Sequence, residues 1–449
     1  MFTTRSILGT TACFLFLVFP ACSQNDNVDE FVKTEMVKRK IPGISIAIVK
    51  NGEILKAKGY GLANVEWNAP ATTETVYQSG SVGKQFTATL VMMLVEQGKM
   101  ELEDPIIKYI PDAPDSWKGI TIRHLITHTS GISSKFDEQI DLHRDYTENE
   151  LTKLIAGNPL DFQPGERMSY SNAGYVMLGI IIQKATNRFY GDLLQEKIFK
   201  PLGMSTTRII SELDIIPNRA AGYFLLQGQL KNQGWVSPSL NSTADGNLNL
   251  TVLDLAKWDA ALYTDKLLKR SHLDEMWTPV KLANGRTEPY GFGWSLGNVN
   301  GHRVIEHGGA WQGFTAQISR YVDDKLTVIV LANLARAGTS EIANGIASFE
   351  IPELTSKMRK ETAIDPKIFD AYVGDYEIEP GVILNFSRKG DKLYGWFPNL
   401  PQMEVFPESE TTFFIKEPSA QFTFIKDATG KVDRVILHMR GDREAKKVR

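Results

Sequence analysis

The sequence predicts a mixed α/β (α+β) protein in two domains: a central antiparallel sheet with a large helical subdomain, then a C-terminal antiparallel β-barrel. Strand patterns occur at both ends of residues 28–351 with a long helical stretch between them, so one sheet is assembled from both ends. Beyond residue 364 only short alternating strands separated by turns remain, which is typical of a barrel or sandwich. A length of 449 residues and a hydrophobic fraction of 42% fit two domains with cores.

The first domain is expected to open with a helix over residues 28–40, where apolar residues recur at helical spacing. Residues 43–64 then indicate two strands joined at Asn51-Gly52, a dipeptide favoured in tight hairpin turns. A long helix is expected from Ser81 to Gly98, ended by the glycine, and helical patterns continue to about residue 264.

Strands return in the last part of the first domain, before a closing helix over residues 340–349. The expected strands are 290–298, 302–309, 314–324 and 325–334. A polar, proline-flanked run over 352–363 is the predicted linker, and the barrel is predicted over 364–449.

The first 23 residues have the pattern of an export signal. Arg5 supplies an early positive charge, an apolar run extends from Cys13 to Phe19, and small residues follow it. Cys22 precedes a polar run as the acceptor cysteine of a bacterial lipoprotein does, so the chain is expected to be periplasmic or a membrane-anchored lipoprotein, with the choice left open. Both cysteines lie in this segment, so the mature chain cannot form an internal disulfide.

The charge balance excludes one class of partner. Lysine and arginine number 50 against 53 acidic residues, a net charge of −3. No basic excess is available to bind phosphates, so nucleic acid is not an expected partner. The sequence does not indicate the oligomeric state.

The first motif with chemical meaning is Ser81-Val82-Gly83-Lys84. Ser81 stands where a loop enters the long helix, so backbone N–H groups and the helix dipole favour negative charge that develops there. Lys84 lies one turn further along the same face. A lysine freed of its proton can accept the serine proton, whereas a helix cap with an exposed lysine is the alternative interpretation.

The second motif is Tyr170-Ser171-Asn172, set between a Pro-Gly turn and another helical run. A phenol near the serine can relay its proton. The Asn172 amide can hydrogen-bond both the lysine and a substrate carbonyl. The same residues also suit an ordinary turn.

The third motif is His307-Gly308-Gly309, predicted to end the strand at residues 303–306. Glycines at a strand edge let a substrate backbone approach closely, so the strand can bind an extended acyl chain by strand addition. His307 is then expected to face the pocket, although a lone histidine is more often structural.

These three motifs, in this order, resemble the active-site signature of serine β-lactamases and penicillin-binding proteins. The segments IRHLITHTSGI, PGERMSYSNAGYVMLG, PLGM, YGFGW and EHGGAWQGF are similar to other recurrent segments of the class C β-lactamase and DD-peptidase superfamily. The resemblance implies the β-lactamase/DD-peptidase-like fold over residues 28–351. The C-terminal part resembles the lipocalin-like barrel appended to many members.

The resemblance implies a serine acyl-hydrolase without metal or cofactor. Ser81 is the nucleophile, Lys84 and Tyr170 are coupled bases, and Asn172 positions the acyl group. The backbone N–H groups of Ser81 and Ala310 form the oxyanion hole.

Further implied roles concern the third motif and the substrate. His307 belongs to the catalytic set, and Gly308 and Gly309 line the substrate strand. The expected substrates are peptide-like amides, of D-amino-acid or D-Ala-D-Ala type, or small esters. A carboxylesterase, a weak class C β-lactamase and a non-catalytic penicillin- or peptidoglycan-binding protein remain the alternatives.

The third motif departs from the Lys-Thr-Gly of lactam-hydrolysing members. Gly308 has no hydroxyl, and His307 carries a full charge only below about pH 6.5. This argues against an efficient β-lactamase, unless Arg303 or Arg320 replaces the missing cation. An α/β-hydrolase is a weaker interpretation, because its Gly-x-Ser-x-Gly motif is incomplete around Ser81. A metal site is also weaker, because no third ligand accompanies His124 and His128.

Overall fold

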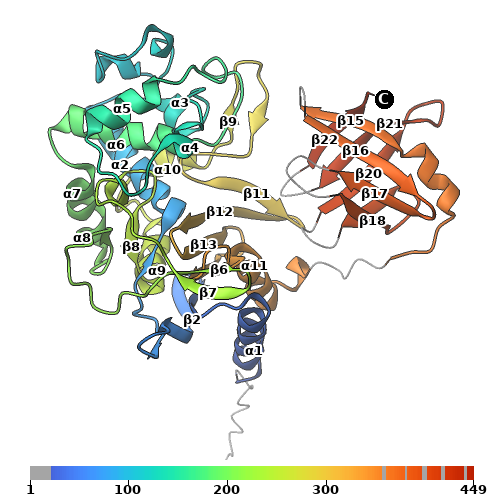
Figure 1. Cartoon of the computed structure of the whole chain (residues 1–449), viewed down its shortest axis with the longest axis horizontal. Coiled ribbons are helices and arrows are strands. Elements are labelled where there is room, and N and C mark those ends of the chain that lie inside the picture. The colour runs from blue at the N-terminus through green and yellow to red at the C-terminus, as the bar shows by residue number, and fades with distance from the viewer. Residues whose placement is uncertain are drawn as a thin grey trace, which may run out of the picture.

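The computed structural model describes residues 22–355, 361–379, 382–396, 402–415, 420–438 and 442–448 (Figure 1). The predicted signal segment lies almost wholly outside the described residues. No described helix is long and apolar enough to cross a membrane.

The first domain is built on one seven-stranded antiparallel sheet with strand order β11-β12-β13-β14-β1-β2-β3. Strands from the beginning and the end of the domain meet where β1 pairs with β14, Ile46 lying opposite Val330. The strands are β1 (Gly43–Lys50), β2 (Glu53–Asn64), β3 (Ala69–Pro70), β11 (Ser295–Val299), β12 (His302–Trp311), β13 (Phe314–Tyr321) and β14 (Leu326–Ala332). The predicted fold class is thereby confirmed.

Both faces of this sheet are buried, in two separate cores. In β1, Ile44, Ile46 and Ile48 face one core, whereas Ala47 and Val49 face the other, as the two-residue period of a strand requires. Helices α1 (Cys22–Arg39) and α11 (Thr339–Glu350) cover the first face, and the helical subdomain covers the second. The active-site motifs therefore lie on the subdomain side.

The helical subdomain lies between β3 and β11. Its helices are α2 (Lys84–Glu96), α3 (Ile122–Ile126), α4 (Phe136–Gln139), α5 (Glu148–Ala156), α6 (Asn172–Thr186), α7 (Tyr190–Leu194), α8 (Lys200–Leu202), α9 (Val252–Ala261) and α10 (Arg270–Met276). Small sheets lie among them, which the sequence did not indicate: β4 (Tyr77–Gln78), β8 (Leu248–Leu250) and β5 (Arg208–Ile209); β6 (Tyr223–Leu226) and β7 (Gln229–Asn232); β9 (Val280–Lys281) and β10 (Thr287–Glu288).

Two predicted boundaries near the active-site motifs were wrong. The helix expected to begin at Ser81 begins at Lys84, because Ser81 lies in the 3-10 turn η1 (Gly80–Gly83), where Gly80 has a positive φ of 48°. The strand expected over residues 302–309 continues to Trp311, because residues 304–311 stay paired with β13. The third motif therefore lies within a strand.

The C-terminal domain is a closed eight-stranded barrel, drawn orange to red in Figure 1. Its strands are β15 (Gly374–Glu379), β16 (Val382–Lys389), β17 (Lys392–Trp396), β18 (Met403–Pro407), β19 (Thr412–Ile415), β20 (Ala420–Lys426), β21 (Val432–His438) and β22 (Asp442–Lys447). The rings of Tyr376, Phe386, Phe422 and Phe424 are at most 1% exposed and contact one another inside it. The barrel thus has a packed aromatic core.

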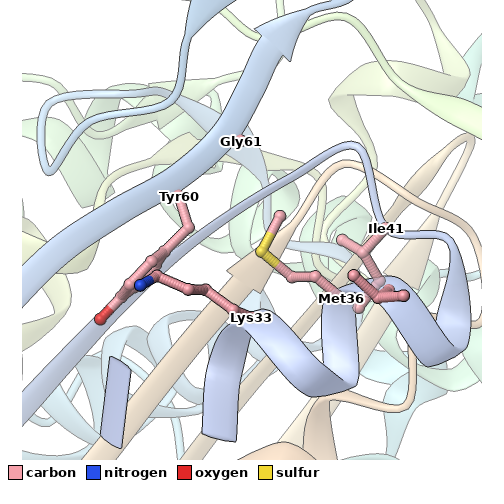
Figure 2. Close-up of a pocket in the computed structure, with 6 residues that line it drawn as sticks. Lys33, Met36, Ile41, Tyr60 and Gly61 are labelled. Atoms are coloured by element: carbon pink, nitrogen blue, oxygen red, sulfur yellow. The ribbon is translucent and has the colours of Figure 1, made fainter. Parts of the chain in front are cut away.

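A shallow apolar hollow of about 400 Å³ lies where α1 crosses β2 (Figure 2). Met36 and Ile41 line it beside Tyr60 and Gly61. Its residues pack with the core on the α1 and α11 face, so the hollow is on the far side of the sheet from the motifs.

Candidate active site

Ser81 lies at the junction of the sheet and the helical subdomain. The preceding residue Gly80 packs directly on Ala310 of β12, and any Cβ at position 80 would overlap the Ala310 nitrogen. Gly83 meets Gly246 in the same way on the other side. The turn that carries Ser81 is therefore fixed by two close backbone contacts that need glycine.

Lys84 is fully buried and holds the centre of the site. Its Nζ lies 3.0 Å from Ser81 Oγ, 2.9 Å from Asn172 Oδ1 and 2.6 Å from the carbonyl oxygen of Asp245. The Asn172 and Asp245 oxygens can only accept, whereas the Ser81 hydroxyl can also donate, so a neutral amine at this position has a lone pair for the Ser81 proton. The predicted nucleophile and its predicted base are thus in direct contact, and the predicted cap with an exposed lysine does not describe Lys84.

In the second motif, Tyr170 and Asn172 flank Ser171, the N-cap residue of α6. Ser171 caps α6 by accepting the Gly174 N–H, and Asn172 is the first residue of that helix. Tyr170 is 40% exposed, and its ring centre lies 4.9 Å from Lys84 Nζ. Among the described hydrogen bonds none joins the Tyr170 hydroxyl to Ser81, so the ring contact with Lys84 is what brings it to the site.

Asp137 of α4 borders the site on the Asn172 side. Its carboxylate oxygens accept from Asn172 Nδ2 at 3.3 and 3.4 Å. Partial desolvation raises the pKa of Asp137, and the nearby Asp245 carboxylate raises it further. No sequence motif singles out this residue.

Close packing of η1 against β12 brings together the two segments that carry the predicted oxyanion-hole nitrogens. β11 pairs with β12 only as far as Glu306, so the edge of β12 from His307 to Trp311 is not covered by β11. A Cβ at Gly309 would overlap the Ser79 carbonyl and lie 3.0 Å from the Ser81 nitrogen. The Ser81 and Ala310 nitrogens therefore lie on backbone segments that pack directly against each other, and their role as an oxyanion hole stays a prediction.

His307 belongs to the site but is enclosed by protein. It is 5% exposed, and its ring centre lies 6.2 Å from that of Tyr170. Nδ1 contacts the Gly308 carbonyl at 2.6 Å and Nε2 contacts the Tyr290 hydroxyl at 3.1 Å. Burial, with the charge of Lys84 adding to it, lowers the pKa of His307 to about 4. The imidazole is therefore neutral near pH 7.

A second buried histidine extends this contact into a chain. His128 Nδ1 accepts the N–H of Ser171, and its Nε2 lies 3.1 Å from the Tyr290 hydroxyl. Since the Gly308 carbonyl can only accept, His307 carries its proton on Nδ1 and accepts from Tyr290, which in turn accepts from His128. Burial lowers the pKa of His128 well below its usual value, so the ring is neutral and carries one proton, on Nε2. Each donor in this chain of hydrogen bonds therefore has one acceptor.

Neither candidate arginine supplies a cation to the site. Arg303 is exposed and pairs with Asp323. Arg320 is fully buried, donates to Asp259 at 2.6 Å and lies among the rings of Tyr263, Trp277 and Trp294. The loss of the Lys-Thr-Gly lysine is therefore not compensated by either residue.

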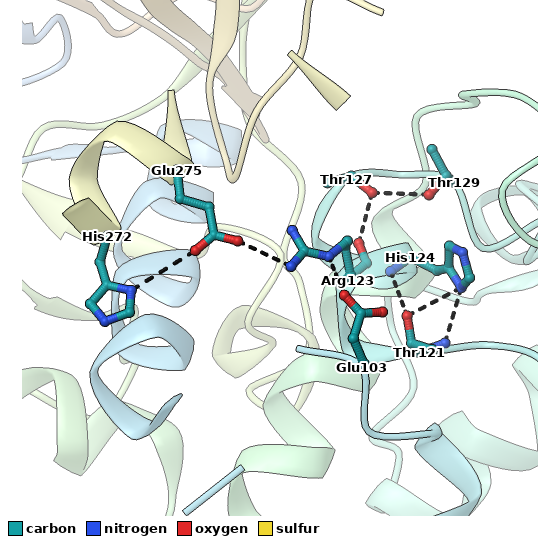
Figure 3. A network of polar contacts seen from close by, with 8 residues as sticks. All are labelled: Glu103, Thr121, Arg123, His124, Thr127, Thr129, His272 and Glu275. Atoms are coloured by element: carbon teal, nitrogen blue, oxygen red, sulfur yellow. Dashed lines mark hydrogen bonds and ion pairs between the residues drawn. The ribbon is translucent and has the colours of Figure 1, made fainter. Parts of the chain in front are cut away.

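His124 has a structural role in the first turn of α3 (Figure 3). It closes a capping box with Thr121 at the start of α3, while the neighbouring Arg123 pairs with Glu103 and Glu275. No group of three or more metal-ligating side chains occurs in the part of the chain that the structure describes.

Several residues of the site could not be identified from the sequence. Asp245 contributes through its backbone carbonyl, which any residue possesses. His128 and Tyr290 lie in the recurrent segments that supported the family resemblance, but their contact joins positions far apart in the sequence.

A serine hydrogen-bonded to a buried lysine, with an asparagine on the same lysine, is the arrangement of a serine hydrolase of the Ser-Lys type. The chain belongs to the Beta-lactamase family, whose profile matches residues 28–351. A domain of unknown function, DUF3471, matches residues 358–448. The resemblance proposed from the motifs is confirmed.

Known relatives support the same assignment. Penicillin-binding protein 4* of Bacillus subtilis is 31% identical over 86% of this chain and 90% of its own length. A D-aminopeptidase of Gluconobacter oxydans is 28% identical over 65% of this chain, which spans 56% of that protein. The structure of D-amino acid amidase from Ochrobactrum anthropi, complexed with L-phenylalanine amide, matches with a TM-score of 0.65 and 25% identity over 73% of this chain and 99% of that one.

Proposed function

We propose that this protein hydrolyses amides of D-amino acids and short D-peptides through an acyl-enzyme on Ser81. The contact between Ser81 Oγ and Lys84 Nζ carries the proposal, because it pairs a nucleophile with a buried base. A D-aminopeptidase and a D-amino acid amidase among its relatives support the substrate class.

In acylation, Ser81 Oγ bonds to the substrate carbonyl carbon while its proton passes to the Lys84 and Tyr170 pair. The carbonyl oxygen becomes an oxyanion between the Ser81 and Ala310 nitrogens. The carbon–nitrogen bond then breaks, and Tyr170 delivers the proton to the departing amine.

In deacylation, a water molecule bonds to the acyl carbon and the bond to Ser81 Oγ breaks. The proton lost by the water returns to Ser81 through Tyr170. The products are a free carboxylic acid and an amine, and the enzyme regains its initial state.

The substrate preference follows from the neutral third motif. A β-lactam or a D-Ala-D-Ala peptide presents a carboxylate on the leaving-group side, and His307 is neutral with both ring nitrogens engaged. A simple amide leaving group has no such charge. We therefore favour amides over penicillins, with short esters as accessible substrates.

The test is steady-state hydrolysis of D-phenylalanine amide, p-nitrophenyl acetate and nitrocefin by wild type and Ser81→Ala. Turnover of the amide and the ester that Ser81→Ala abolishes, with nitrocefin much slower, is expected. Ser134→Ala, an exposed serine of the same subdomain, is the matched control. Absence of any Ser81-dependent turnover would mean a non-catalytic binding protein, and fast nitrocefin turnover would mean a β-lactamase.

The cellular location is part of the same proposal. The export pattern of residues 1–23 supports a periplasmic enzyme, and Cys22 supports a lipid tether. Mass spectrometry of the N-terminal peptide from membrane and soluble fractions separates the two: a diacylglycerol adduct on Cys22 establishes the tether, and an unmodified N-terminus excludes it.

A further inference from the structure

A second cavity, of about 190 Å³, opens one residue beyond the oxyanion hole. Gln78, three residues before Ser81, and Trp311, directly after Ala310, both line it. Their segments are held together because Gly80 packs on Ala310 and the Tyr77 ring packs on Phe314 at 6.3 Å. The volume corresponds to roughly six water molecules, enough for one amino-acid side chain with its amino group.

The cavity lies on the acyl side of the site. Tyr170 must protonate the leaving group, and its ring lies near His307, so the leaving group occupies the His307 end of the β12 edge. Trp311 is four residues further along the strand, which corresponds to about 13 Å. A substrate with its carbonyl at Ser81 and Ala310 therefore extends its acyl part toward the cavity.

The lining favours a hydrogen-bond donor with positive charge. None of the residues around the cavity is lysine or arginine, while Glu212, the amides of Gln78, Asn241 and Gln312 and two indoles face it. Gln78 is only 7% exposed, and its Oε1 has no hydrogen-bond partner among the described residues. A buried amide oxygen without a partner is costly, and rotation of the Gln78 side chain toward the cavity would let a ligand N–H satisfy it.

Glu212 is connected to β12 by two hydrogen bonds through Asn241. Trp311 Nε1 donates to Asn241 Oδ1 at 2.9 Å, and Asn241 Nδ2 donates to Glu212 Oε1 at 3.4 Å. Arg219 lies 3.9 Å from Glu212 Oε2, the other carboxylate oxygen, and is not part of the cavity lining. An ammonium group has three donors and no acceptor, and it also binds over indole faces.

We propose that this cavity, lined by Gln78, Glu212 and Trp311, binds the free α-ammonium group of the acyl residue. The inference rests on the proposed function and narrows it: the enzyme acts at a free amino terminus and rejects N-acylated substrates. The rival position for the ammonium is Asp137, the carboxylate beside Asn172.

The test compares three substrates: D-phenylalanine p-nitroanilide, its N-acetyl derivative and p-nitrophenyl acetate, whose two-carbon acyl group does not reach the cavity. Wild type should prefer the free amine over the N-acetyl compound in kcat/KM. Glu212→Gln and Gln78→Met should each raise KM for the free amine by about ten- to a hundredfold, as loss of a bond to a charged group does, with kcat for p-nitrophenyl acetate unchanged within a factor of two. Glu138→Gln is the exposed control.

Equal kcat/KM for the free and acetylated substrates would overturn the inference, as would a KM increase confined to Asp137→Asn. If the proposed function itself is wrong, the protein will turn over none of the three substrates, p-nitrophenyl acetate included. In that case calorimetric titration of Ser81→Ala with D-phenylalanine amide still decides the matter. Binding that Glu212→Gln abolishes supports the cavity, and binding that Glu212→Gln leaves intact, or no binding, rejects it.

Discussion

The hydroxyl of Tyr290 lies 3.1 Å from Nε2 of His307, and this contact determines what the third motif can do. With Nδ1 bonded to the Gly308 carbonyl, both ring nitrogens of His307 are engaged within the protein. His307 therefore stabilises the β12 edge and the wall beside Tyr170 as a neutral ring. In this arrangement it does not offer a cation to a substrate carboxylate.

Replacing Tyr290 by phenylalanine tests this chain of hydrogen bonds. Tyr290→Phe keeps the ring but leaves a buried nitrogen on His307 and an N–H on His128 without partners. The expected loss is about 1–3 kcal/mol of unfolding free energy, measured by urea denaturation, together with a lower kcat/KM. Tyr60→Phe removes a hydroxyl bonded to Asp29 on the far side of the sheet, so it should cost stability without changing kcat/KM. Equal kcat/KM for wild type and Tyr290→Phe would show that the chain has no part in catalysis.

The lowered pKa of His307 predicts how stability depends on pH. The unfolded histidine binds a proton near pH 6.5, whereas the folded one does so only near pH 4, so the unfolded state holds more protons between these values. The contribution of His307 to the free energy of unfolding should therefore be fully present above pH 6.5. It should fall by about 3 kcal/mol as the pH drops toward 4. Urea unfolding of His307→Gln should show a shallower decline over the same range. Parallel curves for the two proteins would contradict the buried, neutral state.

Lys84 is expected to be required as a base and as a donor. Lys84→Met fills the same space but leaves Asn172 Oδ1 and the Asp245 carbonyl without their donor, and kcat should fall by about 10²- to 10⁴-fold. Lys84→Arg should not restore activity, because a guanidinium does not give up its proton. The exposed Lys135→Met is the control, and activity above a tenth of wild type in Lys84→Met would remove Lys84 from the mechanism.

Gly309 and Gly308 form a matched pair for testing the oxyanion hole. A Cβ at position 309 meets rigid backbone at Ser79 and Ser81, whereas at position 308 the nearest atom is Oε1 of the Gln317 side chain, 2.9 Å away. Gly309→Ala should lower kcat by about 10²- to 10³-fold, as loss of one oxyanion donor does. Gly308→Ala should lose less, because Gln317 can move. The same loss in both variants would argue against a hole at Gly309.

The fold could be predicted from the sequence because its signals are local. The Asn51-Gly52 turn between the first two strands and the helical spacing of residues 28–40 each depend on neighbouring residues. The order of the Ser81, Tyr170 and His307 motifs then indicated one site. The small sheets of the subdomain were missed because their strands are two to four residues long.

The contacts that define the chemistry of the site depend on distant residues and could not be predicted. The Asp245 carbonyl on Lys84 has no residue signature. The neutral state of His307 depends on its burial and on the Tyr290 hydroxyl at its Nε2, which only the folded chain brings together. Arg320 looked available from its strand position, but Asp259, 61 residues away, binds it in the core.

The most direct test of the central claim is the covalent intermediate itself. Wild-type protein mixed with D-phenylalanine p-nitrophenyl ester, quenched in acid within milliseconds and digested, should show one D-phenylalanyl group on the peptide that contains Ser81. Ser81→Ala should show no adduct and no burst of p-nitrophenol. An adduct on another residue, or full turnover by Ser81→Ala, would contradict the account.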